Sequence, residues 1–322
     1  MDPSHVRLVV PPAAAGERLD VFLSSVVPDL TRSQAKRLID HGRVVVDGFS
    51  HKAGTVLRGG ERVDVRPFPP NDETVQPDAI PVDVLHSDDD VIVLVKPSDI
   101  VVHPAAGHPR GTLVNALAAL GLCGAGGDPR RPGIVHRLDR GTSGVMVVAR
   151  NARAHAHLGR QFHDHSVERS YLAIVQGSPP DDGRFETPYR RHPVDRKRFT
   201  SRAPAVRRAV TAFRTIERSG AYAMIEARLG TGRTHQIRVH MADHGFPVLG
   251  DPLYGRPPRD ARGRLAAAAL GRQALHARTL GFHHPGTGEF VRFEAPPPEE
   301  FVRAWSMLAS GRGAAVGGRR SM

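Results

Sequence analysis

The sequence is poor in cysteine and in long apolar runs. Cys123 is the single cysteine among 322 residues, which excludes an internal disulfide and a cysteine-built zinc site and fits a reducing compartment. No stretch approaches the ~20 apolar residues that a membrane span requires. Residues 1–20 lack the basic start and apolar core of an export signal. We therefore expect a cytoplasmic protein that is not bound to a membrane.

Acidic residues are also in the minority. The chain has 45 Lys and Arg against 33 Asp and Glu, a formal net charge of +12. This surplus favours a polyanionic partner, nucleic acid first and an anionic membrane surface second. Hydrophobic residues make up 40% of the chain, and its length allows one large domain plus a small one.

The motifs of several enzyme classes are missing. No phosphate-binding G-x-x-x-x-G-K-[ST] occurs, and the glycines of residues 121–127 lack the strand–helix context of a dinucleotide site. The GTSG of residues 141–144 is not the G-x-S-x-G of a hydrolase, so Ser143 is a poor candidate nucleophile. His240 and His244 lie four residues apart, but no Glu stands in an H-E-x-x-H frame and no third ligand can be named. We expect no metal site.

Composition divides the chain into segments. Short β-branched runs between glycine and proline turns predict a mixed, strand-rich α+β domain, without the regular alternation of a doubly wound fold. Within it, helices are expected over residues 112–121 and 234–245, the second ending at Gly245. The boundaries are a lead segment at 1–15, a compact unit at 16–68, a linker rich in proline and acid at 69–82, the large domain at 83–305, and a basic, glycine-rich tail at 306–322 that we expect to be disordered.

The compact unit carries two helical patterns followed by two short strands. Residues 17–30 have apolar residues at helical spacing, and the second helix begins with a capping box of Thr31 and Gln34. A strand then runs into an Asp-Gly turn. This order resembles the S4 RNA-binding module. A cationic helix face is usually only solvated, but the resemblance implies contacts with the RNA backbone. The residues in question are Arg32, Lys36 and Arg43.

Asp139 stands in the sequence HRLD, between two arginines. Alone it could be a capping or turn residue. It is preceded by KPSDIVVHPAAGHPRGTLVNAL, however, and followed by GTSG, YLAIV, LGTGRTHQIRVHMADHGFPVLGDPLYG and RQALHARTLGFHHPGTG. These blocks, in this order, closely resemble the ribosomal large-subunit pseudouridine synthases with an HRLD motif. The D-type members, which also carry an S4 module, are the most similar.

The resemblance implies a mainly antiparallel sheet and a cofactor-free isomerase. Such an enzyme cuts the bond between ribose and a uracil nitrogen, turns the base and rejoins it through carbon. Asp139 would be the essential carboxylate, whether it attacks the sugar, attacks the base or removes a sugar proton. Arg238 would pair with Asp139, Tyr171 would lie against the base, and Arg137 would fill the space that a flipped uridine leaves. The other expected substrate-binding residues are His136 and Thr142.

Residues 190–208 hold eight Arg and Lys. A solvated loop is the ordinary interpretation, but in a protein that must hold folded RNA this segment predicts a clamp on the phosphate backbone. The residues expected to make these contacts are Arg190, Arg191, Arg196, Lys197 and Arg198.

We expect a monomer that acts on large-subunit ribosomal RNA or a pre-ribosomal particle. Two alternatives stay open: the same chemistry on transfer RNA or another structured RNA, and a noncatalytic RNA-binding ribosome-assembly factor. A glycosidase-like hydrolase is remote, because no second motif carboxylate is evident.

Overall fold

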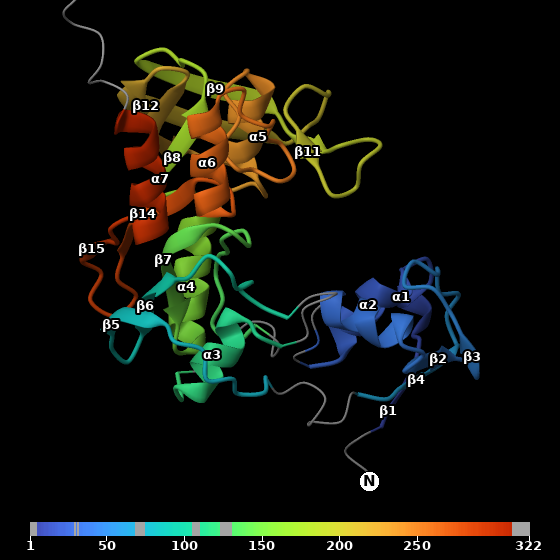
Figure 1. The fold of residues 1–322 in the computed structure, drawn as a ribbon. Coiled ribbons are helices and arrows are strands. Elements are labelled where there is room, and N and C mark those ends of the chain that lie inside the picture. The colour runs from blue at the N-terminus through green and yellow to red at the C-terminus, as the bar shows by residue number, and fades with distance from the viewer. Residues whose placement is uncertain are drawn as a thin grey trace, which may run out of the picture. The chain divides into compact units, whose positions relative to one another are not determined.

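The computed structural model describes residues 5–28, 30, 32–67, 75–104, 110–122 and 131–310, apart from the side chain of Ser33. The chain forms two compact units, Met1–Thr74 and Val75–Met322 (Figure 1). The expected capping residue Thr31, the cysteine Cys123, part of the linker and residues 311–322 of the tail lie outside the described residues.

The small unit is a four-stranded antiparallel sheet with two helices. Its sheet order is β1-β4-β2-β3, and helical spacing buries one face of each helix, as Leu19 and Leu23 of the first and Leu38 of the second illustrate. The lead segment is part of this sheet, because Val6 pairs with Val65. The elements are β1 (Val6–Val9), η1 (Pro12–Ala14), α1 (Leu19–Val26), α2 (Arg32–Asp40), β2 (Val44–Val46), β3 (Phe49–Ser50) and β4 (Arg62–Val65).

The large unit is built on a nine-stranded sheet. Its order is β5-β6-β7-β14-β8-β13-β12-β9, with β15 also paired to β14. Among these strands β7 and β14 pair in parallel and the others pair antiparallel, which confirms the expected mixed, mainly antiparallel fold. The elements are β5 (Asp83–Ser87), β6 (Val91–Lys96), α3 (Leu113–Ala119), β7 (Ser143–Ala149), α4 (Ala152–His163), β8 (Glu168–Gln176), β9 (Asp182–Pro188), β10 (Arg190–Arg191), β11 (Phe199–Thr200), β12 (Arg208–Ser219), β13 (Tyr222–Leu229), α5 (Gln236–Asp243), α6 (Ala261–Leu270), β14 (Leu275–His283), β15 (Phe290–Glu294) and α7 (Glu299–Ala309).

Both faces of the central strands are buried. Side chains of a strand alternate between faces, so Met146 and Val148 of β7 join one apolar cluster while Val145 and Val147 join another. Helix α4 packs beside β7 on the second face, and α6 and α7 lie side by side (Figure 1). All seven residues of β7 are buried. Within the described residues no helix is long and apolar enough to cross a membrane.

Helix α7 extends the folded domain beyond the expected boundary. It runs to Ala309, so residues 306–309 are helical rather than part of a disordered tail. Leu308 is buried, and the Ser219 hydroxyl donates to its carbonyl. The apolar positions Phe301, Trp305 and Leu308 repeat at helical spacing, and this repeat continues past the glycine-rich composition on which the boundary was drawn.

Gly144 of the GTSG segment allows a close backbone approach. Gly144 has a φ of +125°, and a Cβ there would lie 2.1 Å from the Ala277 carbonyl oxygen, where β7 meets β14. Gly144→Ala is therefore expected to lower the free energy of unfolding by about 2–4 kcal/mol, measured by urea denaturation.

Gly245→Ala is the matched control for the Gly144 variant. Gly245 has a φ of +94° but open space around its Cβ position, so its substitution should cost only about 1–2 kcal/mol of backbone strain. Equal costs at both glycines would contradict the contact with β14.

Candidate active site

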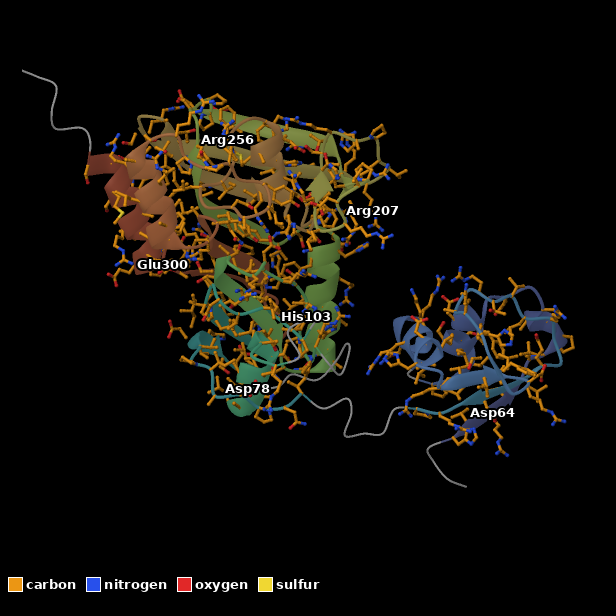
Figure 2. All side chains as sticks on the ribbon, turned by 45° about the vertical axis from the view of Figure 1, so that its right-hand side comes forward. Asp64, Asp78, His103, Arg207, Arg256 and Glu300 are labelled. Carbon is orange, nitrogen blue, oxygen red and sulfur yellow. The ribbon has the colours of Figure 1, made fainter. Side chains whose placement is uncertain are left out.

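The HRLD segment lines a cavity of about 620 Å³. Its walls come from the loop before β7, from α4, from β8 and from the start of α5, so distant blocks of the sequence meet there. Figure 2 draws the side chains of the large unit, with His103 of the cavity wall labelled. A second cavity of about 700 Å³ shares Arg137, Asp139, His235 and Arg238 with the first. Asp139 therefore lies where the two cavities adjoin.

The loop that presents Asp139 is fixed at both ends. Ile134 forms an isolated bridge with Val148, and the Gly141 amide donates to the Ser98 carbonyl at 2.6 Å. Between these points Leu138 is buried. Leu138 anchors this segment in the apolar core, and Asp139 beside it lines both cavities.

Arg238 connects Asp139 to a second carboxylate. Its Nη1 donates to Asp139 Oδ2 at 3.0 Å, while its Nε and Nη2 donate to the two oxygens of Asp251 at 2.7 and 2.9 Å. Asp251 in turn accepts from the amides of Leu253 and Tyr254. This bidentate pair holds the guanidinium rigidly, so the nitrogen that reaches Asp139 has a defined position.

The charges of this ion pair are mutually supported. Burial alone would lower the pKa of Arg238, but the hydrogen bonds and charges of Asp251 and Asp139 raise it above its ordinary value. Burial would likewise raise the pKa of Asp251, but Arg238 and the two backbone amides lower it. Arg238 thus stays cationic beside Asp139.

His235 faces the other oxygen of Asp139. The Phe199 amide donates to the Tyr254 hydroxyl, and this hydroxyl also forms a hydrogen bond with His235 Nδ1 at 2.9 Å. Burial lowers the pKa of His235, and its other ring nitrogen, Nε2, faces Asp139. This atom lies 3.9 Å from Asp139 Oδ1.

Asp251, His235 and Tyr254 were not among the residues expected from the sequence. They lie in the blocks that carried the resemblance, beside Arg238 and in the Asp-Pro-Leu-Tyr segment. Their position there was the available signal, but the spacing gives no indication of the hydrogen bonds that join them.

The expected substrate-binding residues reach the first cavity in different ways. Tyr171 of β8 lines it and is 9% exposed, and burial raises the pKa of its hydroxyl. Arg137 is exposed and lines both cavities. His136 also lines the wall, but its Nε2 accepts from the Val147 amide. Thr142 is buried and accepts from Gln273 at 3.2 Å, an intramolecular contact that the sequence did not suggest.

The cationic segment forms a hairpin of β10 and β11 beside α5. Arg190, Arg191, Arg196 and Lys197 are exposed on it. Arg198 instead places its guanidinium 5.3 Å from the Tyr254 ring centroid, at the edge of the active site.

The cationic residues of the small unit also differ from one another. Arg32 binds the buried carboxylate of Asp20 at 2.9 Å and so joins α2 to α1. Lys36 is exposed on α2, and Arg43 donates to the Pro67 carbonyl.

One group of metal-ligand type occurs among the described residues, formed by His86, Asp88 and His284. His284 Nδ1 accepts from the amides of Gly286 and Thr287, so its Nε2 carries the proton and donates to Asp88. A protonated nitrogen cannot ligate a metal, and hydrogen bonding accounts for the group.

His240 likewise has both ring nitrogens occupied. They bind the hydroxyls of Thr211 and Thr187, each at 2.9 Å. This pattern is that of a polar core histidine.

The site therefore combines a carboxylate held by a buried arginine with a tyrosine in the wall of the same cavity, an arrangement typical of an enzyme active site. The chain matches the RNA pseudouridylate synthase family over residues 90–243 and the S4 domain over residues 17–63. It is 45% identical to ribosomal large subunit pseudouridine synthase D of Xanthomonas campestris, over 96% of this chain and 94% of that protein. It is 43% identical to an uncharacterized RNA pseudouridine synthase of Aquifex aeolicus, over 91% of this chain and 94% of that protein.

The fold comparison agrees. The solved structure of human RNA pseudouridylate synthase domain containing 1 covers 69% of this chain and 85% of its own, with a TM-score of 0.55 and 23% identity. The chain belongs to the RNA pseudouridylate synthase family. The expected family, fold class and isomerase activity on RNA are thereby confirmed.

Proposed function

We propose that this enzyme converts uridines of large-subunit ribosomal RNA to pseudouridine, without a cofactor and with Asp139 as its essential carboxylate. The observation that carries the proposal is Asp139, held by Arg238 in a cavity that Tyr171 also lines. The name of the Xanthomonas relative supports the large-subunit target, and the S4 domain supports an RNA partner.

The geometry divides the work among the residues. A stacked uridine must leave its helix before it can react, at a cost of a few kcal/mol. Arg137, exposed at the junction of the cavities, would take the vacated place, and the Tyr171 ring would lie against the extruded base. His136 and Thr142 would complete the wall of the base pocket.

Asp139 would act through Oδ1. Arg238 occupies Oδ2, whereas Oδ1 faces His235 at 3.9 Å, beyond hydrogen-bond distance. Oδ1 is therefore the oxygen that we assign to the substrate. It would attack the sugar, attack the base or remove a sugar proton, and after cleavage the cavity walls would keep the uracil in place while it turns.

Pseudouridine mapping tests the proposed function. Ribosomal RNA lacking the modification is incubated with the protein, and new pseudouridines are expected in large-subunit RNA. Modification of transfer RNA alone would support the first alternative. Tight RNA binding with no pseudouridine in any RNA would support the assembly-factor alternative, and release of free uracil would indicate a hydrolase.

We propose that the β10–β11 hairpin binds the RNA backbone, while the small unit supplies a second contact through α2 and the residues that follow it. The enzyme would act as a monomer on ribosomal RNA or a pre-ribosomal particle, and the remaining tail would add positive charge. Arg190, Arg191, Arg196 and Lys197 are the exposed contacts of the hairpin, with Arg198 at its inner edge. Arg32, Lys36 and Arg43 are those of the small unit.

Neutralising the hairpin should reduce the salt dependence of binding. A triple variant with Arg190, Arg196 and Lys197 changed to Gln removes three exposed charges. Each lost phosphate contact lowers the slope of log K against log salt by about 0.7–0.9, so the slope should fall by about 2. Binding to a fragment of large-subunit RNA is measured at several salt concentrations.

A control triple variant removes the same charge elsewhere. Arg264, Arg292 and Arg303 are exposed on α6, β15 and α7, and their change to Gln should leave most of the slope intact. If both variants lower the slope of log K against log salt equally, the hairpin does not contact the RNA backbone.

A further inference from the structure

Arg169 is a buried arginine without hydrogen-bond partners for two of its nitrogens. It lies on β8, two residues before Tyr171, and is 8% exposed. Neither Nε nor Nη2 has a hydrogen-bond partner. Its guanidinium lies 5.8 Å from the Phe162 ring centroid, and the residue lines the first cavity. Residues i and i+2 of a strand face the same side, so Arg169 and Tyr171 share one wall.

The surroundings of Arg169 hold a second guanidinium group. Arg233 lines the same cavity and is exposed; its Nε donates to the Arg208 carbonyl. Gly232 directly precedes Arg233, and a Cβ there would be 2.7 Å from Arg169 Nη1. Because Gly232 has no side chain, a ligand in the cavity can reach Arg169 Nη1 at this point.

Neutral rather than acidic groups surround these arginines. Burial and the charges of Arg169 and Arg233 lower the pKa of His165, and burial together with Arg169 lowers the pKa of His136 to about 3. Glu168, the neighbour of Arg169 on β8, pairs with Arg292 instead. No carboxylate in the described part of the chain has a hydrogen bond or ion pair to Arg169 among the contacts that the structure gives.

A buried charge without a partner is unfavourable, because it has lost its hydration and gained no hydrogen bonds. Burial lowers the pKa of Arg169 accordingly. Native proteins retain few such groups, and those that remain call for a functional explanation. A bound substrate could supply the hydrogen-bond acceptors that Arg169 lacks.

We propose that Arg169, assisted by Arg233, forms a subsite for a phosphate that flanks the flipped uridine. The proposal rests on the proposed function, in which the base lies against Tyr171. Two parallel N–H groups of a guanidinium match two oxygens of a phosphate. A phosphate that passes Gly232 meets Nη1 first, and Nη2 supplies the second donor. Uracil fits this pair less well, because an N–H donor separates its two carbonyl oxygens.

The spacing along β8 suits this assignment. Two residues of a strand span about 6.6 Å, the scale on which base and phosphate are separated within one nucleotide. Tyr171 would thus contact the base while Arg169 contacts the backbone of the same nucleotide. Arg169 would be a substrate-binding residue that fixes how far the nucleotide enters.

A double-mutant cycle between protein and RNA tests the subsite. The RNA is a hairpin with the uridine that mapping identifies, and the phosphate on its 5′ or its 3′ side is replaced by a neutral methylphosphonate. Arg169→Gln and neutralisation of the contacted phosphate should each weaken binding about tenfold. Together they should weaken it no more than either change alone, because both remove the same interaction.

Arg214→Gln is the matched control, since Arg214 pairs with Glu226 on the β12–β13 face and does not line the cavity. The fold-changes in affinity caused by Arg214→Gln and by either neutral phosphate should multiply, because the two changes affect different interactions. The proposal is overturned if the fold-changes in affinity caused by Arg169→Gln and by a neutral phosphate also multiply, for the 5′ phosphate and for the 3′ phosphate alike. If Arg169→Gln does not fold, Arg169→Lys, which keeps the charge but loses the paired N–H groups, enters the same cycle.

A stability measurement separates substrate binding from a structural role. Arg169→Met removes the unpartnered charge, so its thermal midpoint should equal or exceed that of the wild type while RNA affinity falls. A large drop in the midpoint would show that Arg169 is a structural anchor instead. The proposed function has its own test. Wild type should convert the hairpin with unmodified phosphates, and an Asp139 variant should not. Neither result depends on Arg169.

Discussion

Asp139→Asn is expected to slow pseudouridine formation by at least about a thousandfold, the scale on which loss of a catalytic nucleophile acts. The change removes the charge but keeps the shape, and an amide oxygen can still accept from Arg238 Nη1. Asp251 continues to hold Arg238 through two hydrogen bonds, so the fold and the cavity should survive. RNA affinity should therefore stay within about threefold of the wild type. Single-turnover conversion of the target RNA is the measurement.

Asp182→Asn provides a matched control for the same change of charge. Asp182 is exposed on β9 and does not line either cavity, so this variant should convert RNA at the wild-type rate. Turnover retained by Asp139→Asn would remove Asp139 from the essential role. Loss of RNA binding along with turnover would mean that the carboxylate maintains the site rather than reacts.

Asp251→Asn should produce the largest loss of stability, about 3–5 kcal/mol in the free energy of unfolding at pH 7. The side chain of Asp251 is fully buried, and that of Arg238 is 4% exposed. The substitution removes the charge of Asp251, so the buried guanidinium loses its bidentate partner. Urea denaturation measures the loss. Activity should fall as well, because the nitrogen that reaches Asp139 is no longer held in place.

The stability difference should also depend on pH. The folded-state pKa of Asp251 lies below the ordinary value of 3.8. Its charged form therefore stabilises the fold at every pH above about 4, and this contribution is lost as the pH falls through the folded-state pKa. The gap between wild type and Asp251→Asn should be constant from pH 5 to 7 and should narrow below pH 4.

Glu186→Gln is the control for Asp251→Asn, because Glu186 forms exposed ion pairs with Arg184 and Arg208. Such exposed pairs contribute little to stability, because water and salt screen them. A cost for Asp251→Asn no greater than that of Glu186→Gln would show that Arg238 does not need its buried partner.

The sequence predicted which residues form the centre of the candidate site, because these residues lie in distinctive blocks. Asp139, Tyr171 and Arg238 come from three such blocks, and the structure brings them to one cavity. The strand runs of β6, β7, β8 and β13 were also predictable, since β-branched residues between turns mark buried strands.

The remaining features depend on contacts that composition does not encode. Asp251 and His235 act through hydrogen bonds between segments, and a spacing rule cannot indicate these. The cationic residues Arg32 and Arg198 were grouped with their neighbours by charge, yet the direction of each side chain gives them intramolecular partners. The helix that ends at Ala309 was missed because the glycine content of the tail outweighed its apolar repeat.

The burial of β7 has a consequence for the rigidity of the site. Asp139 lies four residues before a strand whose amides are shielded on both faces, and such amides exchange with solvent only when the whole domain unfolds. The carboxylate is thus attached to a part of the domain that should open rarely. In the proposed reaction, a detached uracil would turn in a pocket that is anchored to this closed strand.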